Sequence, residues 1–246
     1  MWGVNFILQI VTAMVLVMIF SDMKYKVKGL GLFRILFYLP NLIAAATVAL
    51  MFNILLDTNF GAVNELLLKY NLISEPVKWI QHKLLAKLSV SGIQTWMWFG
   101  NSFILFMASI QAVSKDMFEA ARIDGANRFQ ILRYITVPSI RPILIYVGIT
   151  GLIGGLQLYD IPQLLLPTTG DYTTARLATE TVIMRIVWFK DNFNYGMAAT
   201  YSIALFVVVI SIVASFTLFG QRDAIKAKFI EKFGKKALTE GGVDDE

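Results

Sequence analysis

The residues whose types could support binding or chemistry are concentrated in one charged stretch of an otherwise apolar chain, Lys115 to Pro142. Asp116 is followed three residues later by Glu119, a spacing typical of a capping box at the start of a helix. Gly125 predicts the end of that helix, because glycine adopts the left-handed conformation at little steric cost. The stretch therefore predicts a short, carboxylate-bearing helix with a sharp corner, held against something in the water phase.

A second short helix is predicted after this corner, from Asn127 to about Ile135, and Pro138 is predicted to close it. Residues three or four apart are neighbours on a helix, so each predicted helix presents one apolar pair on a single face. These pairs are Phe118 with Ala121, and Phe129 with Leu132. Two short helices joined at a glycine corner are the predicted outcome.

Sequence signatures of catalysis are missing. No G-x-x-x-x-G-K-[ST] pattern occurs, because Gly234-Lys235 lacks the first glycine five residues before it. The chain has no cysteine, which excludes disulfides and thiolate metal sites. His82 is the one histidine and is interpreted as an exposed loop residue. We therefore predict a protein that is not an enzyme and holds no cofactor and no metal.

Composition places the chain in the membrane class. Apolar residues make up 57% of the chain, above the roughly 45–50% of soluble domains. Long uncharged runs predict an all-α, polytopic helical bundle of about five transmembrane helices. A signal peptide is the competing interpretation of the first run, and it is disfavoured because no Lys or Arg precedes Lys24. The predicted spans are Trp2–Ser21, Leu36–Leu56, Val90–Val113, Pro142–Tyr159 and Tyr195–Gly220.

Charge distribution predicts the topology. Basic residues cluster after the first span, after the third span and at the start of the tail, which by the positive-inside rule places the amino terminus outside and the carboxyl terminus in the cytoplasm. The net charge of +5 is attributed to this bias and not to nucleic-acid binding. The predicted division is a transmembrane domain over residues 1–220 and a cytoplasmic tail over residues 221–246, with a disordered end.

Three motifs in the charged stretch carry a family resemblance. Glu119-Ala120-Ala121, Asp124-Gly125-Ala126 and Ile135-Thr136-Val137-Pro138 together resemble the EAA loop of ABC-transporter permeases, in the form found in sugar permeases of the maltose and glycerol-phosphate import type. The segment Pro167–Asp171 departs from the family's T-x-G-G-P turn. Further matching elements are Pro40 within Tyr38–Asn41, Phe60–Asn64, Trp79, Tyr159-Asp160 and Tyr195–Ala199.

The resemblance implies a permease subunit of an ATP-driven importer in a bacterial-type cell (inner) membrane, with the EAA loop (115–138) in the cytoplasm. The implied partners are a second permease, two cytoplasmic ATPase subunits and an extracellular solute-binding protein. A sugar or oligosaccharide is the implied substrate; a non-sugar solute such as an amino acid or phosphate is one alternative, and a non-transport membrane scaffold is another. Because related permeases commonly carry six or more helices, we hypothesise that one leading helix is absent.

The resemblance also implies which residues couple the chain to the ATPase, since the family's EAA loop docks into a cleft on that subunit. Glu119 is interpreted as an ion-pair partner for a basic ATPase residue, or as a cap on its own helix. The apolar side chains either fill the cleft or pack on the spans. The implied coupling residues are Phe118, Glu119, Ala120, Ala121, Gly125, Phe129 and Leu132.

Polar residues at membrane depth are candidates for the substrate path, because such groups face protein or a cavity. The candidates are Asn101, Gln157, Tyr159 and Asp160. Hydrogen bonding between helices is the alternative role for each, and Asp160 could be solvated at the membrane interface. Gly148, Gly151 and Gly155 recur at helical spacing, which indicates close helix packing or, alternatively, room for substrate.

Overall fold

The computed structural model describes residues 1–20, 29–166 and 173–220, and the chain divides into two compact units, Met1–Leu205 and Phe206–Glu246. The elements found in the described residues are helical, which confirms the all-α class. They are α1 (Trp2–Phe20), α2 (Leu30–Leu42), α3 (Ala45–Leu55), α4 (Ala62–Lys69), α5 (Lys83–Gln111), α6 (Lys115–Ile123), α7 (Arg128–Ile131), a π-helix (Leu132–Thr136), α8 (Val137–Ser139), α9 (Arg141–Leu156), α10 (Asp160–Leu165), α11 (Thr173–Thr179), α12 (Val182–Asp191) and α13 (Tyr195–Gly220).

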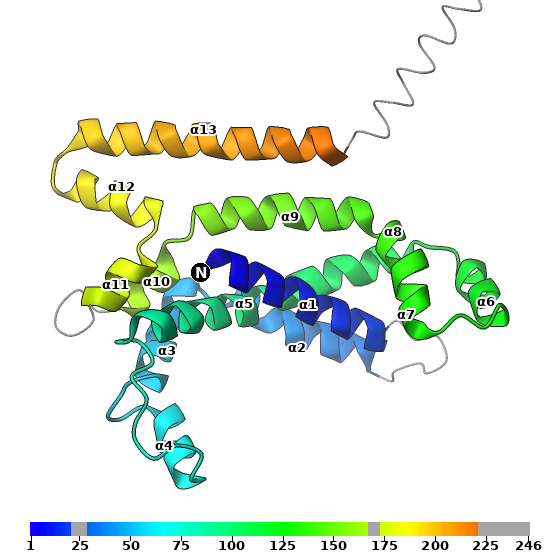
Figure 1. Ribbon diagram of the computed structural model, residues 1–246, viewed down its shortest axis with the longest axis horizontal. Coiled ribbons are helices and arrows are strands. Elements are labelled where there is room, and N and C mark those ends of the chain that lie inside the picture. The colour runs from blue at the N-terminus through cyan, green and yellow to red at the C-terminus, as the bar shows by residue number, and fades with distance from the viewer. Residues whose placement is uncertain (21–28, 167–172, 221–246) are drawn as a thin grey trace, which may run out of the picture. The chain divides into compact units, whose positions relative to one another are not determined.

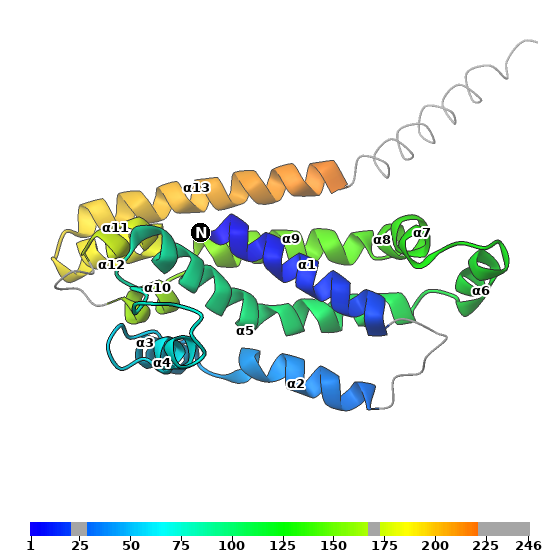
Figure 2. The ribbon, with the colours of Figure 1, turned by 60° about the horizontal axis from the view of Figure 1, so that its bottom comes forward.

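Three long helices of the first unit, α1, α5 and α9, run side by side (Figures 1 and 2). α6, α7 and α8 lie at one end of these helices, and α3, α4, α10 and α11 lie at the other end. Aromatic side chains fill the contact between α1, α2 and α5: the Phe37 and Phe103 rings meet edge to face at 5.5 Å, and Phe20 meets Phe103 at 5.7 Å. Phe103 and Phe106 are fully buried there.

Membrane-spanning capacity agrees with the prediction in number. Within the described residues, three helical segments are long and apolar enough to cross a membrane, and the total reaches five if each of two bent helix pairs is counted as one span. One bent pair is α2 with α3, and the other is α5 with α6. The first span is α1, whose described residues are Trp2–Phe20; the predicted last residue, Ser21, lies outside the described residues. α13 has the predicted bounds of the fifth span.

The second predicted span, Leu36–Leu56, is wrong as a single helix. α2 begins at Leu30 and ends at Leu42, and α3 leaves at 89° to it. Pro40 therefore lies at the end of α2 and not in the first turns of a span. Its carbonyl accepts the amide of Ile43, three residues later, in place of the spacing of four found within an α-helix. Each half has its own packing partner, α5 for α2 and α10 for α3. Hydropathy registers only the apolar run and not this change of partner.

A close backbone approach fixes the crossing of α2 and α5. A Cβ atom on Gly100 would overlap the backbone carbonyl of Phe37, so glycine alone permits this contact. α5 itself begins at Lys83, seven residues before the predicted start at Val90, and so takes its first two turns from the predicted polar loop. Of the apolar residues in these turns, Ala86 is fully buried in the core, whereas Leu84 and Leu88 are exposed.

The predicted helix–corner–helix motif is present, with a different start. Ser114, and not Asp116, caps α6: its hydroxyl accepts the amide of Asp116 at 3.2 Å. The predicted Asp116–Glu119 capping box is therefore wrong by two residues, because a helix takes its cap from the Ser that precedes it, and Asp116 then lies in the first turn.

Gly125 forms the corner as predicted, with φ of 77°. Its amide donates to the carbonyl of Arg122 at 3.0 Å, and the amide of Ala126 donates to the carbonyl of Ala121 at 2.9 Å. This pair of bonds is a Schellman motif, which closes α6 and turns the chain toward α7.

The second helix of the motif begins with a true capping box. The side chain of Asn127 accepts the amide of Gln130 at 2.9 Å, and the side chain of Gln130 accepts the amide of Asn127 at 2.7 Å. The prediction that Pro138 closes this helix is wrong. Before the proline the helix changes to a π-helix, Leu132–Thr136, and helical structure continues to Ser139. The wider π-turn accommodates Pro138, which has no amide hydrogen to donate.

The structure of Pro167–Asp171, where the sequence departs from the family turn, lies outside the described residues, as do the loop Ser21–Lys28 and the tail from Gln221 onward. Beside the first of these gaps, Arg176 of α11 donates to the carbonyl of Leu166 and to the side chain of Gln163, both at 2.8 Å. These bonds join α11 to α10, and the buried Leu165 and Ala175 pack in the same apolar cluster.

Candidate functional site

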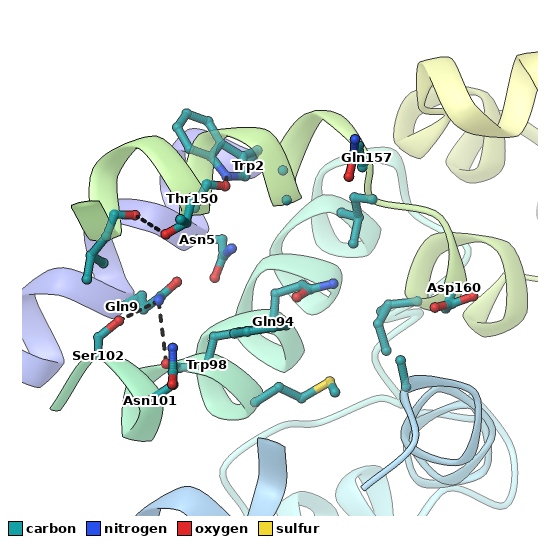
Figure 3. Close-up of a pocket in the computed structure, with 18 of the residues that line it drawn as sticks. Trp2, Asn5, Gln9, Gln94, Trp98, Asn101, Ser102, Thr150, Gln157 and Asp160 are labelled. Atoms are coloured by element: carbon teal, nitrogen blue, oxygen red, sulfur yellow. Dashed lines mark hydrogen bonds between the residues drawn. The ribbon is translucent and has the colours of Figure 1, made fainter. Parts of the chain in front are cut away.

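A cavity of about 420 Å³ lies between α1, α5, α9 and the start of α10 (Figure 3). All four substrate-path candidates line it: Asn101 from α5, Gln157 and Tyr159 from the α9–α10 connection, and Asp160 from the first turn of α10. The sequence alone predicts no common location for these residues, since Asn101 and Gln157 are separated by the whole charged stretch. Their side-chain contacts with substrate remain a prediction.

Several lining residues were not among the sequence candidates. They are amides and indoles of α1 and α5: Trp2, Asn5, Gln9, Gln94 and Trp98. A signal for the α5 residues was present in the sequence, because Gln94, Trp98 and Asn101 stand at i, i+4 and i+7 and so share one helix face. For α1 the signal was the rarity of amide side chains in an apolar run, which marks groups that face protein or a cavity.

Two of the polar residues that line the cavity, Asn5 and Gln9, are already hydrogen-bonded between α1 and α5. The amide of Gln9 donates to the hydroxyl of Ser102 at 2.7 Å, and the hydroxyl of Thr95 donates to the side-chain oxygen of Asn5 at 3.0 Å. Asn5 and Gln9 are both buried. In an apolar surrounding such bonds hold two helices together, with an average near 0.6 and a maximum near 1.7 kcal/mol each.

The α9 glycines seat the indole of Trp2. Its nitrogen donates to the carbonyl of Gly151 at 2.8 Å, and its ring occupies the space that a Cβ atom on Gly155 would need. A Cβ atom on Gly151 would stand 2.9 Å from the ring of Phe6, which stacks on Trp2. Close packing is therefore confirmed for Gly151 and Gly155, which also line the cavity, whereas a Cβ atom on Gly148 would meet nothing within 4 Å.

The coupling candidates lie at the opposite end of α5 and α9 from Asp160 (Figures 1 and 2). Glu119, Ala120 and Phe129 are exposed, while Ala121 and Leu132 are half-buried. Phe118 is only 8% exposed and packs in a cluster with Phe106, Ile110 and Ile140. Of the two positions considered for this ring, against the spans or in an ATPase cleft, it occupies the one against the spans.

Two exposed apolar side chains of α6 were not among the sequence candidates. Ile123 is 87% exposed and Met117 is 50% exposed. With the exposed Phe129, they are large apolar side chains close in sequence to the Gly125 corner. Glu119 makes no hydrogen bond or ion pair with any described residue, so the alternative in which it caps its own helix is not found in the structure.

The Phe60–Asn64 element has a structural role. The buried side chain of Asn64 donates to the carbonyls of Thr58 and Val77 at 3.1 and 3.0 Å, and it accepts the indole N–H of Trp79 at 2.9 Å. A Cβ atom on Gly61 would overlap the carbonyl of Asp57. One amide thus closes the connection between α3 and α5, and glycine permits the close approach.

Residues 5–223 match the model of the binding-protein-dependent transport system inner membrane component family. The chain belongs to this family. The resemblance drawn from the EAA-type motifs is thereby confirmed, and this permease-family chain is a multi-pass component of the inner membrane, as its apolar runs predicted.

Named relatives of the permease chain are transport proteins. The lactose transport system permease protein of Rhizobium radiobacter is 29% identical over 209 residues, which cover 84% of this chain and 70% of that protein. The trehalose/maltose transport system permease protein of Thermococcus litoralis is 30% identical over 190 residues, covering 76% and 61%. The diacetylchitobiose uptake system permease protein of Streptomyces coelicolor is 27% identical over 227 residues, covering 88% and 62%.

The fold has solved counterparts. A chain from a bacterial alginate ABC transporter, crystallised in complex with an alginate pentasaccharide-bound periplasmic protein, is similar with a TM-score of 0.79. The similarity covers 90% of this chain and 75% of that one, at 22% sequence identity. At this identity the permease chain shares the fold with that structure, and its substrate must be argued from its own side chains.

Proposed function

We propose that this chain is one of two permease subunits of an ABC importer that moves a sugar or oligosaccharide across the membrane. An extracellular binding protein delivers the substrate, and two cytoplasmic ATPase subunits drive the transport. The proposal follows from family membership and from the names of its relatives, which include lactose, trehalose/maltose and diacetylchitobiose transporters. The chain itself performs no chemistry, because ATP hydrolysis belongs to its partners.

The observation that supports a saccharide best is the composition of the cavity. Five amide side chains and two indoles line one space of about 420 Å³ among helices of membrane-spanning length and composition. Binding sites for small molecules combine aromatic surfaces with a few placed polar groups, and a sugar ring offers both an apolar face and hydroxyls to such a site. Asn101, Gln157, Tyr159 and Asp160 are proposed as part of the path.

Coupling to the ATPase is proposed to run through α6 and α7. Glu119, Ala120, Ala121 and Phe129 supply the contact surface with Leu132, and Gly125 sets the angle between the two helices. Phe118 anchors α6 to the membrane helices instead of touching the ATPase, so that a push on α6 is transmitted to α5 and α9. The exposure of Ile123 and Met117 supports adding both to this surface. ATP then drives transport through its different affinity for two states of the assembly.

The orientation follows from the same assignment. α6 and α7 face the cytoplasm, and α10 and α11 lie on the outer side. The carboxyl-terminal tail, residues 221–246, is cytoplasmic, and residues 1–220 form the permease domain. The basic residues next to the EAA loop support this orientation.

Reconstitution tests the proposal. The complete importer is placed in liposomes, and uptake of lactose, maltose and diacetylchitobiose is measured with ATP inside, with an amino acid and phosphate as comparison solutes. We expect ATP-dependent uptake of at least one sugar and none of the comparison solutes. Uptake of an amino acid or phosphate in place of all sugars would contradict the saccharide assignment.

A further inference from the structure

The short helix α3 runs across the direction of the long helices. α2 lies beside α5, and α3 leaves α2 at 89°, so the axis of α3 lies close to the plane of the membrane (Figures 1 and 2). α2 has 13 residues and is about 20 Å long, whereas the hydrocarbon core of a bilayer is about 30 Å thick. Basic residues precede α2 in the sequence and mark one membrane boundary at its start. α2 therefore ends short of the other boundary, and α3 begins within the opposite leaflet.

α3 has one packed face and one free face. Val48 is buried in the same apolar cluster as Leu165 of α10, and the side-chain amide of Asn53 donates to the carbonyl of Leu165 at 2.7 Å. On the other face, Leu50 is 55% exposed and Ile54 is 70% exposed. No residue of α3 is charged. The contacts with α10 thus determine which side of α3 faces away from the protein, and that side is apolar.

α4 separates its exposed apolar residues from its charged ones. Leu66 and Tyr70, which follows the last residue of α4, stand four residues apart and are both exposed. Glu65 and Lys69 form the neighbouring stripe and are exposed as well. This pattern is typical of a helix that lies in the membrane interface, where tyrosine is enriched. The hydrogen bonds of Asn64 to the carbonyl of Val77 and the indole of Trp79 fix the direction of both stripes.

The free face of α3 continues a larger apolar surface. No charged residue occurs in the sequence from Ile35 to Leu56. A patch of this extent is rarely left in water, so it has a partner. A soluble partner would have to displace lipid from the part of α3 that lies within the leaflet, whereas acyl chains need no such step. The α2 residues of this surface that are at least half exposed are Leu32, Ile35, Leu36, Leu39 and Leu42.

We propose that α3 and α4 form an interfacial element that binds the phospholipids of one leaflet. Its leaflet surface consists of Leu50 and Ile54 among the acyl chains, and of Leu66 and Tyr70 at the level of the headgroups. In the orientation proposed above, this is the outer leaflet. The inference goes beyond the transport function, since it assigns a lipid-binding surface. Because α3 packs on α10, lipid held by this surface supports the helix that begins at Asp160.

The absence of cysteine from the chain permits a depth measurement. The complete importer, with the cysteines of its partner subunits replaced, is placed in nanodiscs of phosphatidylethanolamine and phosphatidylglycerol. Leu50→Cys and Ile54→Cys are spin-labelled one at a time, and collisions with oxygen and with a water-soluble nickel chelate give the depth of each label. The two labels should lie at the same depth within about 2 Å, because four residues of an in-plane helix do not rise through the bilayer.

A matched pair on α1 calibrates this result. Val11→Cys and Val15→Cys are also four residues apart, at positions that are 53% and 48% exposed on a helix of membrane-spanning length. Their labels should differ in depth by about 6 Å, the rise of four residues along a helix axis. All four positions are exposed, so the labels leave the packed faces intact.

Neighbouring positions test α4. The ratio of oxygen to nickel collisions should be at least about twofold higher for Leu66→Cys than for Glu65→Cys, because the two side chains face lipid and water. Addition of the sugar-loaded binding protein should leave the ratio for Leu66→Cys unchanged. If Leu66→Cys does not assemble, Tyr70→Cys replaces it in the same comparison.

Three results would overturn the leaflet surface. One is a depth difference between Leu50→Cys and Ile54→Cys equal to that of the α1 pair, which makes α3 part of a span. Another is a ratio for Leu66→Cys no higher than that for Glu65→Cys, which places α4 in water. The third is a loss of nickel collisions at Leu66→Cys only when the binding protein is added, which makes that protein the occupant. ATP-dependent sugar uptake is measured separately, so importers that transport sugar while failing the depth test lose the leaflet surface and keep the proposed function.

Discussion

The indole of Trp2 packs against Gly151 and Gly155 of α9, and this contact predicts the effect of a substitution at Gly155. Gly155→Ala adds one methyl group in the space that the indole ring occupies. The ring must then move, which breaks the 2.8 Å hydrogen bond to the carbonyl of Gly151 and the stacking on Phe6 at 5.1 Å between centroids. The bond is worth about 0.6–1.7 kcal/mol in a membrane interior and the stacking about 0.5–1.5 kcal/mol. The expected loss is therefore about 1–3 kcal/mol.

A matched control removes the effect of helix propensity. Alanine is favoured over glycine within a helix by about 1 kcal/mol, which offsets part of the loss at position 155. Gly148→Ala makes the same change on the same helix where nothing lies within 4 Å of the new methyl group. Gly148→Ala should be neutral or slightly stabilising, so the difference between the two variants reports the contact with Trp2.

The assay is thermal unfolding of the purified importer, followed through the stability of this chain. Gly155→Ala should melt several degrees below Gly148→Ala. In a Trp2→Ala background the two glycine variants should melt together, because the ring that clashes has been removed. Equal melting points in the chain that retains Trp2 would refute the account of this helix contact.

Three further predictions address the remaining elements. Gly125→Val should uncouple ATP hydrolysis from uptake while the chain still inserts, because a β-branched residue does not readily adopt a φ of 77°. Gly125→Asn should retain coupling, since Asn tolerates this conformation. Equal uptake by the two variants would contradict the role of the corner. Asn64→Ala should destabilise the connection between α3 and α5 by about 2–4 kcal/mol and speed its proteolysis, whereas Asn59→Ala, an exposed neighbour, should not. A double-mutant cycle between Gln9→Ala and Ser102→Ala should give a coupling of about 0.6–1.7 kcal/mol in thermal unfolding, and additive effects would exclude the bond.

Local signals in the sequence predicted the corner of the charged stretch well and its boundaries less well. Gly125 was predictable because its conformation depends on a single residue. The helix start at Ser114 was missed because two capping signals overlap and the structure uses the earlier one. The π-helix before Pro138 was not predictable, since the widened turn is one of several ways in which a chain can accommodate a proline.

For features that depend on contacts between distant residues, the sequence predicted the type of element but not its geometry. The apolar runs predicted the number of spans but not the 89° break between α2 and α3, which depends on separate contacts with α5 and α10. The four predicted path residues do line one cavity, but Gln94 was missed: its spacing places it on one face of α5 with Asn101, and the sequence alone does not show whether that face contacts α1 or borders a cavity. That distinction requires the neighbouring helix.

The polar residues of α5 form two stripes with different surroundings: Ser91, Thr95 and Ser102 are hydrogen-bonded to α1, whereas Gln94, Trp98 and Asn101 line the cavity. Substitutions in the stripe that contacts α1 change the assembly, because Thr95 and Ser102 each satisfy a buried amide of the other helix. Substitutions in the stripe of Gln94 and Asn101 break no described bond, so they can alter the cavity without altering the packing. Likeness of backbone to an alginate transporter at 22% sequence identity therefore carries no information on the solute that this cavity accepts.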